Sequence, residues 1–434
     1  MTTNHTPLKL CLYCVTALSA MADTLSLDGY VKLTLEHNPQ PAISAGAVQA
    51  ASAAVEKSRA SLLPQIGATA GISRAGTGGA SAATGPSGSS GATGNTSSAG
   101  IDAQTLLFDF GKTIFNYKAS GQSLDAATND LRATIQTTVL NARTAYFNYL
   151  LSGQLLIVNE DAFTQAQAHY DQAKILVDVG KQAQFVVIKA AVDVANARVN
   201  VIHARNTLKL ARVQLETNAG IPLADPLVFT DSLGGFEDSI AVNEALTRSF
   251  QNRPELLASR ARLEAARLEL KTAISACFPL INASAGYDWR NYSASRLPAP
   301  DWKHPGWNIG TALSIPLFQG GALHAAVRQA DAALKQAQAA LDATKLNVTQ
   351  EVEQDILQEI EARERISATA VLVEQATESL RLSQERYRSG IAASLEITDA
   401  EVTLANARSS HVQAQFDYRV AHARVLLSIG VLNE

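Results

Sequence analysis

Hydrophobic and polar residues alternate in two short stretches of this chain. In "INASAGYDW", from Ile281 to Trp289, the odd-numbered residues are apolar and the even-numbered residues are polar or glycine. "WNIGTALSI", from Trp307 to Ile315, repeats the alternation. A period of two is typical of a β-strand with one apolar face and one polar face. The two stretches therefore predict a β-hairpin, and "QIGATAGIS" and "IDAQTLLFDF" predict a second hairpin earlier in the chain.

Long stretches with helical patterning surround these strands. Lys112 to Asp178 and Ala322 to Arg388 each contain 67 residues, with no proline and little glycine. A continuous helix of that length is about 100 Å long. A glycine turn at Gly180 or Gly390 follows each long stretch and leads into a second helix of about 40 residues. Helices of about 25 residues precede the hairpins, between Pro39 and Pro64 and between Pro254 and Pro279.

The whole order of elements occurs twice. "LANAR" at Leu404 lies 210 positions after "VANAR" at Val194, and "PLFQGG" follows "LLFDFG" at the same offset. We therefore divide the chain into a signal peptide at 1–22, a first repeat at 23–220, a linker at 221–240 and a second repeat at 241–434. The second helix of each repeat carries apolar or small residues at alternating spacings of four and three, which indicates a heptad seam for coiled-coil packing. His411 occupies one seam position, where packing is a simpler role than chemistry.

The repeat also decides the role of the segment from Gly76 to Gly100, which has no charged residue. By composition alone this segment fits an interdomain linker equally well. Its counterpart in the second repeat joins the two strands of a hairpin, so we expect a long hairpin loop.

Composition and charge narrow the class of protein further. Lys9, the apolar run "LCLYCVTAL" and "AMA" before Asp23 form the pattern of a secretory signal peptide. Lipid attachment at Cys14 is an alternative, although Tyr13 is bulkier than the small residue that usually precedes such a cysteine. Cys277 is the one cysteine after the signal, so we expect no intrachain disulfide and no cysteine-based metal site. The net charge of −4 over 434 residues gives no indication of a nucleic-acid partner.

Four strands of about ten residues match the length of strands that cross a bilayer at a tilt. Four strands cannot close a barrel, and open edges cannot face lipid. Twelve strands from three copies are the simplest closed arrangement. Aromatic residues around the second hairpin fit a girdle at a membrane interface better than a core cluster; these are Tyr287, Trp289, Tyr292, Trp302 and Trp307.

The motifs and their order resemble the TolC family of outer membrane channels over nearly the whole mature chain. The motifs that carry the resemblance are "LEHNPQ", "LLPQI", "LLFDFGK", "NRPELLASRARLEAARLEL", "SIPLFQGG" and "YRSGIAASLEITDAEVTLANAR". The resemblance implies a mostly α-helical chain with membrane β-structure, and a homotrimer whose twelve-stranded β-barrel continues into a long α-helical barrel. It also implies a location in the outer membrane of a Gram-negative bacterium, in contact with lipid, and a periplasmic tip. That tip would dock a periplasmic adaptor (a membrane fusion protein) and an ABC or proton-driven inner membrane transporter.

The resemblance also assigns residues at the tip. Glu396 and Asp399 fall where the family places its constriction carboxylates, although two acids in the first turns of a helix also fit a solvated helix start. The residues expected at the periplasmic tip and in adaptor docking are Val179, Gly180, Tyr387, Ser389 and Gly390. The basic residue that often follows the second glycine is replaced by Ala392, and its carboxylate partner aligns with Val186. Asp178 and Arg388 have opposite charge at equivalent positions and are candidates for a substitute ion pair.

Nothing in the sequence resembles a catalytic constellation, and we expect neither an enzyme nor a cofactor. The preferred function is an exit duct for drugs, small molecules or proteins. The alternative is an exported coiled-coil structural or adaptor protein without a pore. The sequence names neither the cargo nor the transporter.

Overall fold

The computed structural model describes residues 24–76, 93–223, 228–229, 231–235, 240–293, 301–302, 305–389, 391 and 393–432. The expected signal peptide, most of the expected hairpin loop, and Gly390 and Ala392 lie outside the described residues. The chain forms two compact units: unit 1 comprises Met1–Asn38, Val139–Asp238 and Glu359–Ala421, and unit 2 comprises Pro39–Thr138, Ser239–Gln358 and His422–Glu434. Each unit therefore draws on both sequence repeats.

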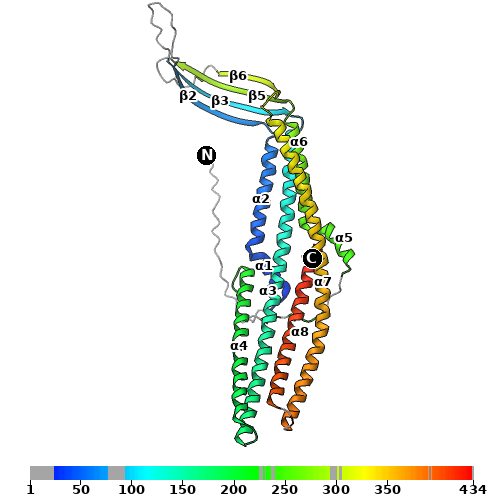
Figure 1. Cartoon of the computed structure of the whole chain (residues 1–434). Coiled ribbons are helices and arrows are strands. Elements are labelled where there is room, and N and C mark those ends of the chain that lie inside the picture. The colour runs from blue at the N-terminus through cyan, green and yellow to red at the C-terminus, as the bar shows by residue number, and fades with distance from the viewer. Residues whose placement is uncertain are drawn as a thin grey trace, which may run out of the picture. The chain divides into compact units, whose positions relative to one another are not determined.

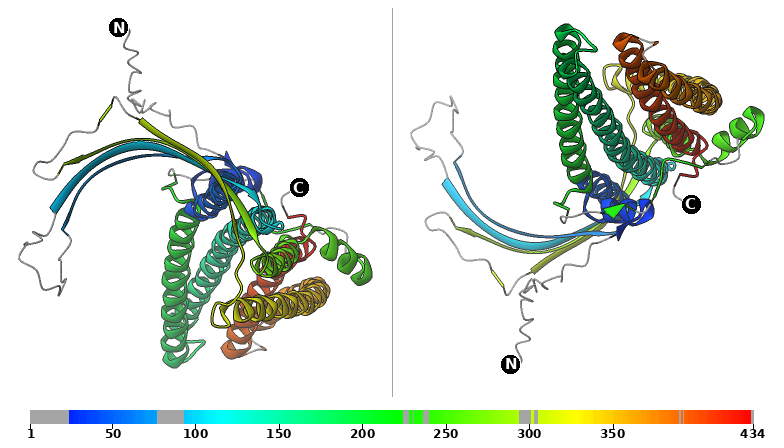
Figure 2. Two further views of the ribbon diagram at one scale, coloured as in Figure 1. Left: turned by 90° about the horizontal axis from the view of Figure 1, so that it is seen from above. Right: turned by 90° about the horizontal axis from the view of Figure 1, so that it is seen from below.

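Unit 2 contains the four predicted strands as one antiparallel sheet (Figure 1). The strands are β2 (Gln65–Gly76), β3 (Thr93–Phe108), β5 (Leu280–Ser293) and β6 (Pro305–Ser314), in the order β2-β3-β5-β6. Helices α2 (Pro39–Ala60) and α6 (Pro254–Ser275) precede the two hairpins. Figure 2 shows that the sheet is strongly curved and open, with β2 and β6 at its two edges.

The strand register confirms the predicted alternation. Ala285 pairs with Ala103 on β3 and with Ile309 on β6, so the apolar residues of neighbouring strands share one face. Ile66, Ile72 and Ile309 are 70–76% exposed, although they are among the most apolar residues of the sheet. This face of the sheet is therefore apolar and is not covered by the chain itself.

The predicted hairpin loop from Gly76 to Gly100 is too long. Residues 93–100 belong to β3, where Asn95 pairs with Arg74 on β2 and with Ser293 on β5. The small polar residues of this stretch look like a linker in sequence. They form a strand because a neighbour on each side satisfies their backbone groups.

The predicted long helices are confirmed with the expected bounds, as α3 (Lys112–Asp178) and α7 (Ala322–Arg388). Asp109 starts α3 by accepting the Thr113 backbone N–H at 2.7 Å, and Gly111 makes the turn between strand and helix with φ +87°. The second helices, α4 (Gln184–Ala219) and α8 (Ser394–Ser428), contain 36 and 35 residues, slightly fewer than expected. No helix in the described part of the chain has the length and apolar composition needed to span a membrane.

The heptad seam of α8 is largely buried, whereas that of α4 includes partly exposed residues such as Val194 and Ala204. On α4, Ala190, Val201, Ala211 and Leu215 are at most 8% exposed. On α8, Leu404, Ala407, Ala414 and Tyr418 are at most 3% exposed. His411 lies in the seam, where its Nδ1 is 3.0 Å from Thr369 Oγ1 on α7, so it has the packing role expected for it.

Two short helices were not predicted: α1 (Leu27–His37) and α5 (Val242–Asn252). Each ends at an extended residue before a proline, Asn38 or Arg253, because the residue before proline is disfavoured in the α conformation. The end of α4 packs against the end of α1 at Gly220, and the end of α8 packs against the end of α5 at Gly430.

Part of the expected linker at 221–240 packs into unit 1. Strand β4 (Val228–Phe229) pairs in parallel with β1 (Thr24–Leu25). The Asp231 carboxylate accepts the Leu27 backbone N–H and the Tyr146 hydroxyl, both at 2.7 Å. Leu233 is buried in the same core as Tyr30 and Tyr146.

Candidate functional site at the tips of the helical hairpins

Helices α3 and α4 form one hairpin and helices α7 and α8 form another, and the two turns are built alike. The Lys181 N–H donates to the Leu176 carbonyl at 2.8 Å, and the Ile391 N–H donates to the Arg386 carbonyl at 2.9 Å. This six-to-one hydrogen bond is the mark of a Schellman turn, which requires a residue with positive φ just after the helix. Gly180 has φ +74° and fills that position in the first turn.

The two predicted constriction carboxylates lie at the start of α8. Ile397 and Ala400 are buried against α7, whereas Glu396 is partly exposed and Asp399 is exposed. Glu396 Oε1 lies 3.3 Å from an Arg386 guanidinium nitrogen on α7. The two acids therefore differ: Glu396 has a cationic partner in its own hairpin, and no ion pair to Asp399 occurs among the described residues.

Tyr387 lies inside the tip. Its ring is 3% exposed, packs with Ile397 and Ala400, and meets the His169 ring of α3 edge-on at 5.6 Å. His169 Nε2 is 3.0 Å from the Ser394 hydroxyl at the start of α8. Burial raises the pKa of the Tyr387 phenol, and its oxygen is buried without a hydrogen-bond partner. Tyr387 and His169 thus hold the two hairpins together at the tip.

The remaining predicted tip residues are on the surface. Val179 is 62% exposed, and Gly180 and Ser389 are also exposed. Asp178 and Arg388 end α3 and α7 with exposed side chains, and no ion pair joins them among the described residues of one chain. Apolar side chains beside the turns are strongly exposed as well: Phe185, Ile188 and Leu395, together with Ile391 in the second turn itself.

Arg386 and His169 were not identified from the sequence. Each acts on a residue of another helix, so no local motif contains the pair. Arg386 is ten positions before Glu396, and the contact becomes visible only when α7 and α8 are folded into a hairpin.

The aromatic residues predicted to form a girdle do not all lie on one face of the sheet. The Tyr287 and Trp289 rings contact each other at 4.9 Å, and Trp289 contacts Trp302 at 5.1 Å. Tyr287 pairs with Trp307 across β5 and β6, so these residues share the apolar face. Tyr292 is three residues after Trp289, an odd number, so it lies on the opposite face, where its ring covers Gly94. Tyr292 therefore does not share a face with Tyr287 and Trp289, and the girdle stays a prediction.

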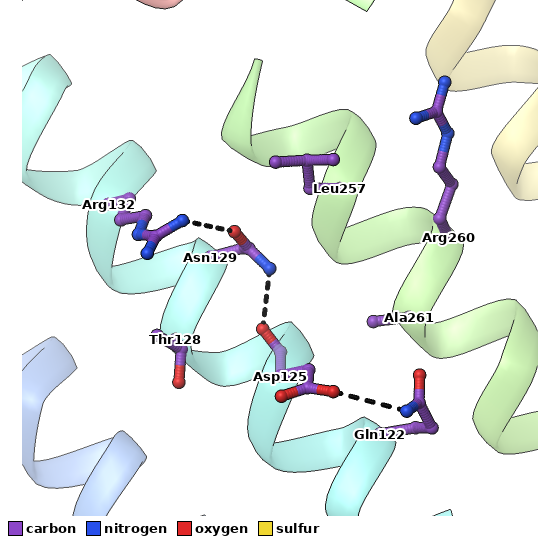
Figure 3. Close-up of a pocket in the computed structure, with 8 residues that line it drawn as sticks. All are labelled: Gln122, Asp125, Thr128, Asn129, Arg132, Leu257, Arg260 and Ala261. Carbon is purple, nitrogen blue, oxygen red and sulfur yellow. Dashed lines mark hydrogen bonds between the residues drawn. The ribbon is translucent and has the colours of Figure 1, made fainter. Parts of the chain in front are cut away.

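A surface hollow of about 450 Å³ in unit 2 gives no indication of chemistry (Figure 3). Its polar side chains bond along their own helix: Gln122 to Asp125, Asn129 to the Asp125 carbonyl, and Arg132 to Asn129. Arg260 donates to the Phe250 carbonyl at 3.1 Å. The polar groups of the hollow are thus satisfied without a ligand. Among the described residues, no cluster of three or more histidine, cysteine or acidic side chains could hold a metal ion.

Comparison with known proteins agrees with this architecture. The sequence profile of the family described as outer membrane efflux protein matches residues 30–220 and 245–431, one match for each repeat. The chain belongs to this family. As an outer membrane efflux protein it is a channel of the outer membrane of Gram-negative bacteria and not an enzyme.

This outer membrane efflux protein is similar in sequence to TolC proteins. It is 28% identical to TolC of Salmonella enteritidis over 92% of this chain and 80% of that protein. It is 28% identical to TolC of Escherichia coli (strain K12) over 69% of this chain, and that match spans 62% of the E. coli protein. The crystal structure of the CmeC outer membrane channel of Campylobacter jejuni has the same fold, with a TM-score of 0.83, 18% identity and coverage of 96% of this chain and 92% of CmeC.

Proposed function

We propose that three copies of this efflux protein form one continuous exit duct, with a twelve-stranded β-barrel in the outer membrane and a helical barrel in the periplasm. The observation that carries the proposal is the open sheet. Strands β2 and β6 each have one hydrogen-bonded neighbour, so each leaves a row of backbone groups unpaired. Because lipid cannot satisfy these groups, the edges must pair with other copies. Three four-stranded sheets make the barrel.

The helices of unit 1 support the same closure. Arg205 joins α4 to Glu160 on α3, Arg408 joins α8 to Asp161 on α3, and Arg365 joins α7 to Asp417 on α8. These ion pairs link α4 to α3, α3 to α8 and α8 to α7, which leaves α4 and α7 at the outer positions, although near the tip α3 also contacts α7 and α4 also contacts α8. Both edges expose apolar residues that are 43–61% exposed; these are Ile188, Val192, Val199, Ile202, Leu210 and Val213 on α4, and Ile360, Val371, Leu372 and Leu382 on α7. Contact between α7 of one copy and α4 of the next buries both stripes.

The tips of the hairpins form the narrow end of the duct in this proposal. Glu396 and Asp399 from three copies line one ring, and their negative charge attracts cations where a narrow pore excludes water. Arg386 offsets part of the charge of Glu396. Asp178 of one copy and Arg388 of another are candidates for an ion pair that holds the closed ring.

The exposed apolar residues beside the two turns suit docking of a periplasmic adaptor. Val179, Phe185, Ile391 and Leu395 are 52–73% exposed, which is unusual for large apolar side chains at a solvent-facing turn. An inner membrane transporter, ABC or proton-driven, completes the proposed pathway and selects drugs, small molecules or proteins.

Native mass spectrometry of the full chain purified from outer membranes in detergent tests the assembly. We expect a trimer, and the same sample should conduct ions across a planar bilayer. A stable monomer with full strand content would contradict the closed barrel, and a trimer that never conducts would favour a scaffold without a pore.

A further inference from the structure

A partly open cavity of about 230 Å³, lined by both polar and apolar side chains, lies in unit 1 between α3, α4 and α8. Coiled-coil seams are normally filled by apolar side chains, but this cavity interrupts the packing between the two hairpins. Amides and carboxylates from three helices line it; these are Asn159, Asp193, Asn196, Asn200, Glu401 and Asn406.

The two carboxylates of the cavity come from opposite hairpins. Asp193 on α4 accepts a long hydrogen bond, 3.4 Å, from the Thr398 hydroxyl on α8. Glu401 lies one turn further along α8 and lines the same cavity. No hydrogen bond or ion pair to the Glu401 carboxylate occurs among the described residues. Burial, and then the negative charge of Asp193, raise the pKa of Glu401 to about 7.

The other charged groups around the cavity do not neutralise this pair. Arg408 on α8 is engaged with Asp161 on α3 at 3.3 Å. Asp193 and Lys189 act in opposite directions on His169 of α3, whereas the charge that acts on Glu401 is that of Asp193. Burial lowers the pKa of His169, so this ring loses its proton before Glu401 does as the pH rises.

We propose that Asp193 and Glu401 form a proton-sensitive latch that joins the α3–α4 hairpin to the α7–α8 hairpin next to the tip. A protonated Glu401 donates its O–H to the Asp193 carboxylate and holds α8 against α4. When the proton leaves, two carboxylates face each other in a half-buried cavity and repel. The latch rests on the proposed function, in which the tips form the narrow end of the duct, so that separation of the two hairpins there would widen it.

The direction of the pH effect follows from linkage. Contact between the hairpins raises the pKa of Glu401 from 4.5 to about 7, so the latched state binds the proton more tightly than the separated state. The stability that the latch contributes is complete below pH 4.5 and is lost as pH rises through about 7. The tip should therefore be held more firmly in acid than at pH 8.

Infrared titration of the full-length protein in detergent tests the protonation. We expect a carboxylic acid C=O band that disappears with a midpoint near pH 7 and is missing in Glu401→Gln. Asp193→Asn should lower the midpoint, whereas Glu374→Gln, at an exposed acid on α7, should leave it unchanged. A midpoint near 4.5, or one that Asp193→Asn does not move, would overturn the latch. A midpoint that falls when Mg²⁺ or Ca²⁺ is added would contradict the latch and indicate that the cavity binds a cation.

Distances between spin labels test the motion. Labels at Ala195 on α4 and Thr403 on α8, in a Cys277→Ser background, should report a longer or broader distribution at pH 8 than at pH 5. Glu401→Gln should keep the short distance at both values. If the distance distribution does not change with pH in a sample that conducts in bilayers, the latch is contradicted and the proposed duct is not. A trimer that never conducts but shows the pH effect would support the latch and contradict the duct.

Discussion

At the scale of single residues, two glycines show why the ends of the repeats look alike. Gly220 has φ +75°, and a Cβ there would lie 2.7 Å from the His37 carbonyl oxygen. Gly430 has φ +79°, and a Cβ there would lie 3.0 Å from the carbonyl of Asn252. The first repeat ends with "NAGI" and the second with "SIGV", which contain Gly220 and Gly430. Glycine is required at each position for two reasons: the left-handed backbone and the close approach of a neighbouring helix end.

We expect Gly220→Ala and Gly430→Ala each to lower the stability by about 1–3 kcal/mol, the usual cost of a strained left-handed backbone. Thermal unfolding of the purified full chain measures this. Gly121→Ala is the matched control, because nothing lies within 4 Å of the added methyl group in the interior of α3. The control should be neutral, or stabilising by up to about 1 kcal/mol. Equal melting temperatures for all three variants would contradict the close-approach argument.

A second residue-scale prediction separates the two tip carboxylates. If both acids line the proposed pore, Asp399 contributes the more effective charge, because Arg386 pairs with Glu396. Asp399→Asn should weaken the cation preference in planar bilayers more than Glu396→Gln does. Arg386→Gln should strengthen that preference. If all three variants conduct with the selectivity of the unmodified channel, these acids face bulk water, and the constriction lies elsewhere.

At the scale of elements, the exposed stripe on α4 is the feature that a single chain does not explain. Ile202 is 59% exposed, so replacing it by aspartate should cost the isolated chain little. In the trimer the new carboxylate is buried against α7 of the next copy, and a loss of about 1.4 kcal/mol per contact shifts that contact tenfold. Native mass spectrometry should show Ile202→Asp largely as monomer. Gln214→Asp, an exposed change on another side of α4, should remain trimeric.

Element boundaries were predictable where a strong local signal fixes them. The bounds of α3 and α7 were predicted from the sequence alone, because glycines stand at both ends and no proline lies between. The first residues of β3 were missed, because Thr93 to Gly100 have little strand propensity of their own and depend on two neighbouring strands. The start of α8 and its two acids were located, but Arg386, the cationic partner of Glu396, was not. The proposed latch could not be predicted from the sequence, because Asp193 and Glu401 are distant in sequence and line one cavity only through tertiary packing.

At the scale of the whole molecule, duplication explains how one chain supplies a sheet with two free edges. Each repeat contributes one hairpin, and the inner strands β3 and β5 pair with each other, so β2 and β6 are left for other copies. Neither edge is blocked by a charged side chain at its centre: Ala70 and Gly71 lie midway along β2, and Ile309 and Gly310 midway along β6. Natural edge strands usually carry such protection against pairing with another chain. In the proposed trimer, both edges pair with strands of other copies.

The open sheet also has a genetic consequence. In the proposed trimer, a copy with one damaged edge can still pair its intact edge with one normal copy, which pairs with a second, and the resulting ring cannot close. Such a copy therefore removes normal subunits from use, in proportion to how often mixed rings form. A strand-edge mutation in one gene copy should be dominant over an intact second copy, whereas a mutation that prevents the chain from folding at all should be recessive.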